Sequence, residues 1–420
     1  MNKRSWRLWL AAGFMAVIVT ACASGLHVGE GPGAERGVGF IRGRILSGSG
    51  QGKVFVVILY QAEGGRERIL DFQMVDREGT FGFLAPAAGW TLVAFEDRNG
   101  NGKLDDAEPR GFLDPRREVG DGEENAPDSL SLWVSENGTI PPGYPVDLAR
   151  FRNSVRRLPP GPGAQTDLGN IVFSRPYGKM GLWNPLGFIR EVGGGVYFVE
   201  PYEKARIPVL FIHGSGGTPR DWRCVMDEWA TERYQPWFFY YPSGPRLTEI
   251  ARRLHWEIRE LQRRYGFERL FLIAHSMGGL VARELINRLL LEGGPRVPVL
   301  VSISSPWGGL DSAGFGAAHS PIQVPSWTDL APGSTFLEGL HRVDIRPLVR
   351  HYLLYGYGSM ATPVTPGGDG IVAVESVLEP RIRKEAFAVY GFKARHGAIL
   401  CSEHAVERCM AILAEEGNRG

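Results

Sequence analysis

A short stretch in the middle of the chain, residues 269–281, limits the possible folds more than any other. An apolar run at 270–273 leads into Ser276, small residues flank this serine, and an amphipathic segment follows at once. A serine at a sharp strand-to-helix turn tolerates no bulky residue two positions before or after it. Ala274 and Gly278 occupy those two positions and are small. The string therefore predicts a strand, a strained turn that carries a nucleophilic serine, and a helix.

Two other interpretations of this string are a glycine-rich turn with a passive serine and a phosphate-binding loop. The second is disfavoured because the chain has no G-x-x-x-x-G-K-[ST] string.

The C-terminal half alternates between short apolar runs and segments with a helical period. Strand-like and helical segments follow one another at 208–213, 247–265, 269–274, 277–292 and 297–302. This alternation is typical of a parallel sheet with crossover helices. We therefore predict an α/β domain at residues 207–420, with residues 176–206 as a linker and the start of that domain.

The N-terminal half has β-type runs between turns, and no long helical period separates the first four of them. The expected strands lie at 54–60, 69–75, 80–84, 90–95 and 171–173. Short strands separated by turn residues indicate a small antiparallel β-sandwich. We place this sandwich at residues 38–175, before the α/β domain.

The first 22 residues have the organisation of an export signal. Basic residues precede an apolar run at 8–19, which is shorter than the ~20 residues that a membrane-spanning helix needs. The run ends in Val-Thr-Ala-Cys22, which resembles the lipobox of bacterial lipoproteins, with Val where these proteins usually have Leu. The resemblance implies that Cys22 is acylated and becomes the mature N-terminus. The alternative is an ordinary cleaved signal peptide with an incidental cysteine.

Residues 23–37 are rich in Gly, Ser and Ala and are expected to form a flexible tether. With a lipid on Cys22, we expect the protein in the bacterial cell envelope, exported and anchored to a membrane. The outer membrane or the cell surface is the expected site.

The charges of the chain are nearly balanced, with 47 Lys and Arg against 46 Asp and Glu and a formal net charge of +1. This balance gives no general attraction to nucleic acid, so no nucleic-acid partner is expected, although a local basic patch remains compatible with it.

Four cysteines are too few for a disulfide scaffold. If Cys22 carries a lipid, Cys224, Cys401 and Cys409 remain. The last two would lie about 12 Å apart along a helix, which is too far for a bridge. We expect all three to be free, small, buried residues.

A second informative string, residues 207–217, lies upstream of the serine. There an apolar run leads into His213-Gly-Ser215-Gly-Gly. Acyl transfer requires N–H donors that are fixed where the carbonyl oxygen becomes negative. The backbone N–H groups of Met277, directly after the serine, and of Ser215 are the expected donors. His213, at the end of the strand, is expected to hold the loop, and His275, beside the serine, is expected to be structural.

Four strings occur in the order that one family has: H-G-S-G-G, A-H-S-M-G-G, I-S-S-P-W-G-G and G-G-D-G-I-V. Together they resemble the bacterial lipase and esterase group of the α/β-hydrolase superfamily. The resemblance covers about half of the chain. It implies a mostly parallel sheet with crossover helices and a serine-dependent hydrolysis of esters.

The remaining members of a catalytic triad follow in the order Ser, Asp or Glu, His. Asp369 stands in a glycine-rich loop after a strand-like run at 351–357, and His396 follows another run at 386–390. A carboxylate in that position orients the imidazole, which acts as the base. Each alternative is expected to be a surface group: His404 for the base, and Asp311, Asp329 or Asp344 for the acid.

Residues 306–350 are too long for a plain connection and are expected to form a lid or wall over the site. Four aromatic residues are candidates for a surface that accepts acyl chains: Trp307, Phe315, Trp327 and Phe336. The alternative is that these rings only pack the lid itself.

One motif in the β-sandwich resembles a calcium loop. The side-chain oxygens of an EF-hand-like pattern and one backbone carbonyl would come from Asp97, Asn99, Asn101, Lys103, Asp105 and Glu108. The preceding run is strand-like and not helical, which is closer to the calcium loops of secreted β-sandwich modules. The alternative is a polar hairpin turn.

Taken together, these patterns predict an exported, lipid-anchored serine hydrolase that acts on carboxylic esters, lipids among them. Ser276 is the nucleophile, His396 the base and Asp369 the acid, and no organic cofactor is implied. Two alternatives remain open: an acyltransferase with the same triad, and a surface-binding lipoprotein with a degenerate hydrolase domain. The partner of the sandwich is not specified by the sequence.

Overall fold

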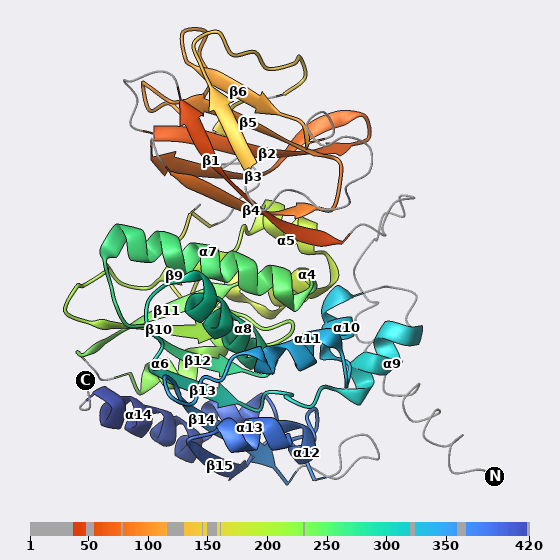
Figure 1. The fold of residues 1–420 in the computed structure, drawn as a ribbon, viewed down its shortest axis with the longest axis vertical. Coiled ribbons are helices and arrows are strands. Elements are labelled where there is room, and N and C mark those ends of the chain that lie inside the picture. The colour runs from red at the N-terminus through yellow and green to blue at the C-terminus, as the bar shows by residue number, and fades with distance from the viewer. Residues whose placement is uncertain are drawn as a thin grey trace.

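The computed structural model describes residues 37–47, 54–76, 79–115, 130–144, 146–148, 158–159, 161–229, 232–319, 324–358 and 367–417. The predicted signal peptide with Cys22, and all of the predicted tether except its last residue, lie outside the described residues. Figure 1 shows two units stacked on each other: a β-rich upper unit from the N-terminal part and a larger α/β unit below it.

The N-terminal unit consists of two sheets that share one apolar core. The three-stranded sheet has the order β4 (Thr80–Pro86), β1 (Val38–Ser47), β7 (Leu130–Val134). The four-stranded sheet has the order β3 (Arg66–Asp76), β2 (Val54–Glu63), β5 (Trp90–Glu96), β6 (Arg110–Leu113). All ladders are antiparallel except β1–β7, which is parallel. The predicted β-rich N-terminal region is thus confirmed.

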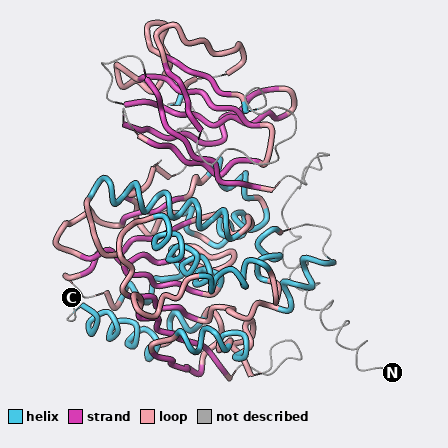
Figure 2. The backbone as a smooth tube through the Cα atoms, viewed as in Figure 1, coloured by secondary structure: helices cyan, strands magenta, loops and turns pink. Residues whose placement is uncertain are grey.

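The C-terminal unit is built on one eight-stranded sheet (Figure 2). Its order is β15 (Ala388–Lys393), β14 (Arg350–Tyr357), β13 (Val299–Ile303), β12 (Phe271–His275), β10 (Ile207–Ile212), β11 (Tyr234–Tyr240), β9 (Gly195–Phe198), β8 (Ala164–Gln165). Every pair is parallel except β9–β11. This confirms the predicted parallel sheet.

Helices cover both faces of this sheet. The longer ones are α7 (Leu247–Tyr265), α8 (Met277–Glu292) and α14 (Glu403–Gly417). The shorter α-helices are α4 (Arg175–Trp183), α5 (Pro185–Glu191), α6 (Arg223–Asp227), α9 (Asp311–His319), α10 (Pro325–Leu330), α11 (Thr335–Gly339), α12 (Val374–Val377) and α13 (Pro380–Glu385). Single 3-10 turns occur at η1 (Ile171–Phe173), η2 (Pro219–Trp222), η3 (Leu340–Arg342) and η4 (Ala398–Cys401).

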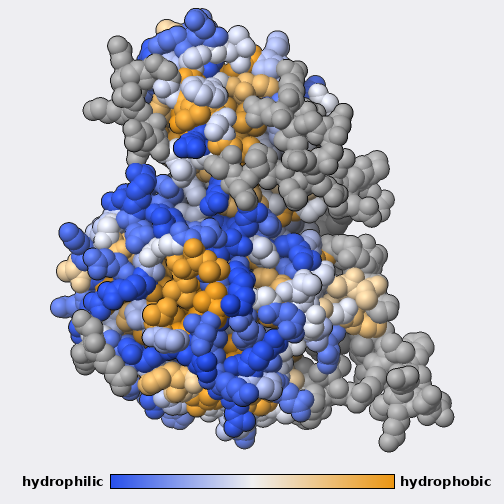
Figure 3. Space-filling view, in the orientation of Figure 1, coloured by the Kyte–Doolittle hydropathy of each residue, from blue (hydrophilic) through white to orange (hydrophobic). Residues whose placement is uncertain are grey.

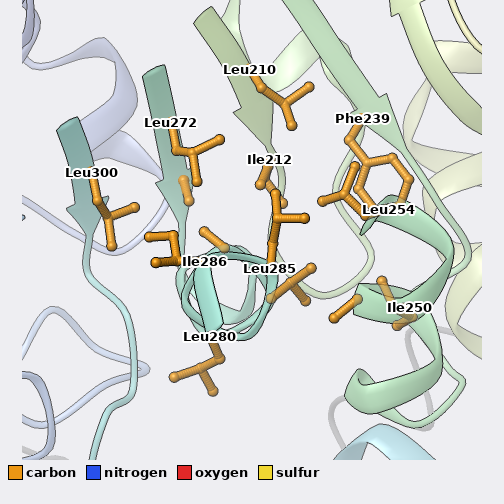
Figure 4. Close-up of a cluster of buried hydrophobic side chains, with 14 of the residues drawn as sticks. Leu210, Ile212, Phe239, Ile250, Leu254, Leu272, Leu280, Leu285, Ile286 and Leu300 are labelled. Carbon is orange, nitrogen blue, oxygen red and sulfur yellow. The ribbon is translucent and has the colours of Figure 1, made fainter. Parts of the chain in front are cut away.

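Side chains on successive strand positions point to opposite faces, so each strand feeds two cores. Leu210 and Ile212 of β10 join the core beneath α7 and α8, while Val209 and Phe211 join the core that includes α14. Figure 4 shows the first of these cores, where α8 lies against the strands and packs beside α7. Strand β10 is therefore apolar along its full length, as buried parallel strands are.

Two expectations for the boundary between the units are wrong. Residues 171–173 form the 3-10 turn η1 and not a strand, because the side chain of Asn170 accepts a hydrogen bond from the N–H of Val172 and caps the turn. Strand β8, which falls within the predicted sandwich range of 38–175, pairs with β9 in the eight-stranded sheet.

The two units share a packed junction along α7. Trp256 of α7 and Ile189 of α5 belong to the apolar core of the β-rich unit. The carboxylate of Glu249 accepts a hydrogen bond from the N–H of Phe40 at 2.6 Å. Buried Arg253 of α7 pairs with Glu257 of the same helix at 2.8 Å, and the charge of Asp71 from β3 stabilises its guanidinium further. The β-rich unit is thus fixed on α7.

The expectation that three cysteines are free is wrong for two of them. Cys224 of α6 and Cys401 of η4 form a disulfide, although 177 residues separate them in the sequence. Only Cys409 is a free thiol within the described residues, and burial raises its pKa to about 12. Spacing along one helix relates only neighbouring residues, so a partner that the fold brings in from another segment cannot be found from it.

In the described ranges, no helix combines the length and the apolar character that crossing a membrane requires.

Candidate active site

Ser276 lies in a strained turn between β12 and α8. Its backbone has φ 55° and ψ −130°, a region that residues with a side chain seldom adopt. The turn is possible because its neighbours are small: a Cβ on Gly278 would lie 2.5 Å from the carbonyl oxygens of Ile212 and His213. Ser276 is 7% exposed, so it is nearly buried.

The structure brings together the three residues that the sequence assigns to a triad. Nε2 of His396 lies 2.9 Å from Oγ of Ser276, and Nδ1 lies 2.8 Å from Oδ2 of Asp369. The three residues follow β12, β14 and β15, whose carboxyl ends meet at one edge of the sheet. A ring that contacts a hydroxyl on one side and a carboxylate on the other can accept the hydroxyl proton.

Asp369 is held as a carboxylate by its surroundings. Its Oδ1 accepts hydrogen bonds from the N–H groups of Ile371 and Val372, at 3.0 and 2.9 Å. Burial opposes ionisation, but the hydrogen bond and charge of His396 and these two N–H groups outweigh it. The pKa of Asp369 is therefore below its ordinary value. A charged Asp369 stabilises a protonated His396.

The predicted oxyanion donors are the backbone N–H groups of Met277 and Ser215, and their place in the oxyanion hole stays a prediction. Met277 is the first residue of α8, so its N–H has no acceptor within the helix. Ser215 stands in the loop after β10 and is exposed. A Cβ on Gly214, the residue before it, would lie 2.8 Å from Cβ of Ser276, so only glycine lets this loop approach the serine so closely.

His213 and His275, which are not expected to act as the base, both make structural contacts. Nδ1 of His213 donates to the carbonyl of Gly214 at 2.8 Å, and its ring stacks on Tyr241. Nε2 of His275 donates to the main-chain carbonyl of His396 at 2.9 Å. Burial lowers the pKa of His213 to about 4, and burial and the nearby His396 lower that of His275 to about 3. Both rings are neutral at neutral pH.

The alternative triad residues lie elsewhere. The side chain of His404 is 81% exposed on α14, beside Glu407. Asp344 pairs with Arg346 on the surface. Asp311 is exposed in the first turn of α9.

Asp329, the remaining alternative, is not the surface group that was expected. Its side chain is buried, accepts a hydrogen bond from the N–H of Leu247, and pairs with Arg246 at 2.8 Å. It therefore caps the N-terminus of α7, which needs acceptors for its first N–H groups.

Residues 306–350 contain the short helices α9, α10 and α11. Trp307 and Phe336 are buried in the core beneath α8, so these two rings pack the segment and do not line an open surface. Trp327 is half-buried and packs edge to face on Trp183 at 5.4 Å. Trp183, at the end of α4, was not singled out by the sequence because no motif marks it.

The predicted calcium loop forms a tight turn whose polar groups bind one another. Asp97 accepts hydrogen bonds from the N–H groups of Asn101 and Gly102, at 3.1 and 3.0 Å. The two oxygens of buried Glu108 accept from the N–H groups of Arg98 and Asp105. Across the described parts of the chain, no group of three or more His, Cys, Asp or Glu side chains is arranged to hold a metal ion. Calcium binding stays a prediction.

Three comparisons with known proteins bear on this fold. Residues 209–392 match the model of the alpha/beta hydrolase family. No protein in the curated set matches the chain.

Similar solved structures include a gene product of Listeria innocua, with 20% identity, 50% of this chain and 94% of that chain covered, and a TM-score of 0.40. The mature lipase BlEst2 of Bacillus licheniformis is 17% identical, with 51% and 95% covered and a TM-score of 0.40. Phospholipase PlaB of Legionella pneumophila in complex with thio-NAD is 18% identical, with 41% and 44% covered and a TM-score of 0.35.

The order of the parallel strands, the serine in a strained turn after β12 and the match over residues 209–392 agree with one another. The C-terminal part of this chain has the α/β-hydrolase fold.

Proposed function

We propose that this protein is an exported, lipid-anchored serine hydrolase that cleaves carboxylic esters, lipids among them. One observation carries the proposal: the ring of His396 lies within hydrogen-bonding distance of both Ser276 and Asp369. A passive serine in a glycine-rich turn would require neither a histidine paired with a carboxylate beside it nor a strained backbone.

In the proposed reaction, Oγ of Ser276 attacks the ester carbonyl carbon while Nε2 of His396 takes its proton. The N–H groups of Met277 and Ser215 stabilise the negative oxygen of the tetrahedral intermediate. The intermediate collapses, His396 gives the proton to the leaving alcohol, and an acyl-enzyme remains. Water, deprotonated by His396, then releases the acid and restores the serine. No organic cofactor takes part in this scheme.

Export is supported by the disulfide between Cys224 and Cys401. Disulfides persist in oxidising compartments such as the bacterial periplasm and the cell surface, and they are rare in the cytosol of mesophiles. The disulfide is independent of the N-terminal 22 residues, so two separate features favour a place in the cell envelope.

A fluorophosphonate probe tests the enzyme assignment directly, because it labels only serines that a neighbouring base activates. The parent should be labelled and Ser276→Ala should not. Rates across p-nitrophenyl esters of increasing chain length would then define the acyl preference. A folded parent that resists the probe and hydrolyses none of these esters would favour a non-catalytic surface lipoprotein.

A further inference from the structure

One edge of the eight-stranded sheet exposes apolar side chains. Strand β15 stands first in the sheet order, and among the described strands only β14 pairs with it. Phe387 and Val389 are 55% and 40% exposed, and Tyr357 of β14 is 42% exposed. Tyr357 is the pairing partner of Lys393, and every second residue of β15 points to one face. Val389, Tyr357 and Lys393 therefore share a face of the sheet.

Helix α13 lies on the same face. Leu353, the pairing partner of Val389, and Ile382 of α13 belong to one apolar core. Figure 3 shows orange and blue residues side by side at the lower end of the α/β unit, where Figure 1 places α13 and β15. Apolar and charged side chains thus meet at this end of the molecule.

Four exposed cations flank the apolar side chains. Arg383 and Lys384 stand in the last turn of α13, just before β15, and Lys393 and Arg395 lie at the other end of that strand. Within the described ranges of the chain, none of the four takes part in an ion pair. Their charges are therefore available to an anionic partner.

The acidic residues nearby do not cancel this charge. Glu385 pairs with a buried arginine of α8, and Glu379 pairs with Arg381. The other carboxylates of α11 and α12 are exposed Glu375 and Glu338, which also binds Arg381. Four cations against these two carboxylates leave the surface positive.

Exposed apolar side chains between cations are the arrangement that binds a charged bilayer. Apolar groups enter the boundary between lipid head groups and acyl chains, and Lys and Arg contact the phosphates around them. A second copy of this chain fits less well, because two positive surfaces repel each other.

We propose that the β15 surface, which consists of these three apolar side chains and four cations, docks on a bilayer that contains anionic phospholipids. The long stems of Lys and Arg let their charges reach the phosphates while Phe387 and Val389 enter the bilayer. Docking of this kind is independent of the ester hydrolysis proposed above, and it would bring that activity to membrane lipids.

The β15 surface adjoins the edge of the sheet that carries the triad. Asp369 and His396 follow β14 and β15, and Arg395 directly precedes His396. Ile371, which is 49% exposed, stands two residues after Asp369. A bilayer that is bound at β15 therefore lies next to the triad.

The experiment uses residues 22–420, the chain that the expected processing leaves, because the apolar run at 8–19 would itself bind lipid. Cys22→Ser and Ser276→Ala are included so that neither an anchor nor hydrolysis contributes. The protein should cosediment with vesicles of mixed phosphatidylcholine and phosphatidylglycerol but not with phosphatidylcholine alone. High salt should weaken the binding, because it screens exposed charges.

The charges are tested by a double variant. Arg383→Gln combined with Lys384→Gln should weaken vesicle binding more than tenfold, because each cation near an anionic bilayer contributes roughly fivefold. Lys179→Gln combined with Lys204→Gln is the matched control, since both lysines are exposed and lie outside the β15 surface. The control should bind like the parent.

The apolar side chains are tested by contact with the bilayer. A nitrobenzoxadiazole fluorophore on Val389→Cys should become brighter on anionic vesicles, and the same fluorophore on Leu291→Cys should not. Leu291 is exposed on α8, away from β15, and the free thiol of Cys409 is buried and does not react. Phe387→Gln should weaken binding severalfold, whereas Leu291→Gln should not.

Three results would overturn the proposal. They are equal binding by the parent and the folded Arg383→Gln, Lys384→Gln variant, equal binding to vesicles with and without phosphatidylglycerol, and a fluorophore at Val389→Cys that stays in water. Self-association that the double variant abolishes, without vesicle binding, would also overturn it and assign the surface to a second copy of the chain.

Activity separates docking from the proposed reaction. With Ser276 restored, the Arg383→Gln, Lys384→Gln variant should hydrolyse a soluble p-nitrophenyl ester like the parent and an ester lipid in anionic vesicles about tenfold more slowly. Docking without any hydrolysis would refute the enzyme assignment and support the β15 surface. Hydrolysis of the soluble ester without docking would do the opposite.

Discussion

The ring of His396 contacts the nucleophile with one nitrogen and the acid with the other, so the three residues act as a unit. We expect Ser276→Ala and His396→Ala each to lower kcat by ~10⁵ to 10⁶, because either change removes the activated nucleophile. Asp369→Asn should lower kcat by about 10⁴, since it leaves nucleophile and base but favours the wrong tautomer. Steady-state kinetics on a p-nitrophenyl ester measures all three.

His404→Ala and Asp344→Asn are the controls, because both side chains lie on the surface, and they should stay within a few-fold of the parent. Asp329→Asn is unsuitable as a control because Asp329 caps α7. A folded, active Ser276→Ala would refute the enzyme assignment, whereas an inactive His404→Ala beside an active His396→Ala would reassign the base.

The buried histidines make stability depend on pH. In the folded state the pKa of His275 is about 3 and that of His213 about 4, both below the value of 6.5 expected after unfolding. Between these values the unfolded chain binds protons that the folded chain does not. The free energy of unfolding should therefore be highest above pH 6.5 and fall as the pH decreases toward 4. Each histidine adds a slope of about 1.4 kcal/mol per pH unit.

Urea unfolding between pH 7 and pH 4.5 measures this slope. His275→Gln should lower the slope, whatever its effect on absolute stability, and His404→Gln should leave it unchanged. An unaltered slope in His275→Gln would show that this histidine is not buried in its neutral form.

At the scale of elements, the disulfide joins η4, which follows His396 closely, to α6, which follows the loop of Ser215. Replacing both Cys224 and Cys401 by Ser should lower the free energy of unfolding by ~2–4 kcal/mol, because the unfolded chain loses a long-range constraint. It should also lower kcat more than it raises KM, since the base becomes less well positioned.

A reducing agent should produce the same loss in the parent and no loss in the double variant, and thermal melts with and without the reductant make this comparison. Equal sensitivity of parent and double variant would place the redox effect elsewhere, at Cys409 or at the predicted lipid-bearing Cys22.

The loop between β5 and β6 tests the calcium prediction. Calcium should raise the melting temperature of the full chain, because a ligand that binds only the folded state stabilises it. Asp97→Ala should abolish the rise, while Asp106→Ala, in the same loop but outside the predicted ligand set, should keep it. No shift at millimolar calcium, or an equal shift in Asp97→Ala, would leave the loop as a polar turn.

The experiment uses the full chain because Trp256 of α7 completes the core of the β-rich unit.

Local pattern determined which elements could be predicted. The helices at 247–265 and 277–292 match α7 and α8 residue for residue, because a helical period is a pattern of neighbouring residues. For α7, the left-handed Gly266 directly after the last residue also marks the end of the helix. The relation of Ser276, Asp369 and His396 was predictable because parallel strands all end at one edge. The disulfide and the cap by Asp329 could not be predicted from the sequence, because both depend on segments that only the tertiary fold brings together.

At the scale of the whole molecule, the proposed lipid anchor bears on where the proposed hydrolase works. If Cys22 carries lipid, Cys22→Ser should shift the protein from the membrane fraction to the soluble fraction, since firm anchoring needs more than one fatty chain. Immunoblots of fractionated cells make the comparison, with Ser276→Ala as a variant whose anchoring is intact. Cys22→Ser that still fractionates with membranes would show that another feature holds the protein there.

The junction along α7 has a consequence for how this protein can be divided. Trp256 lies in a core that belongs mostly to the other unit, and the charge of Arg253 is stabilised by Asp71 across the boundary. A catalytic fragment cut at the boundary would present the indole of Trp256 to water and would lose Asp71 from beside the Arg253–Glu257 pair, and the severed sheets would keep a cavity where the indole had been. The sequence pattern thus separates two units, but contacts across the boundary stabilise both of them. Exchange of the N-terminal unit with that of another hydrolase therefore requires α7 to be exchanged with it.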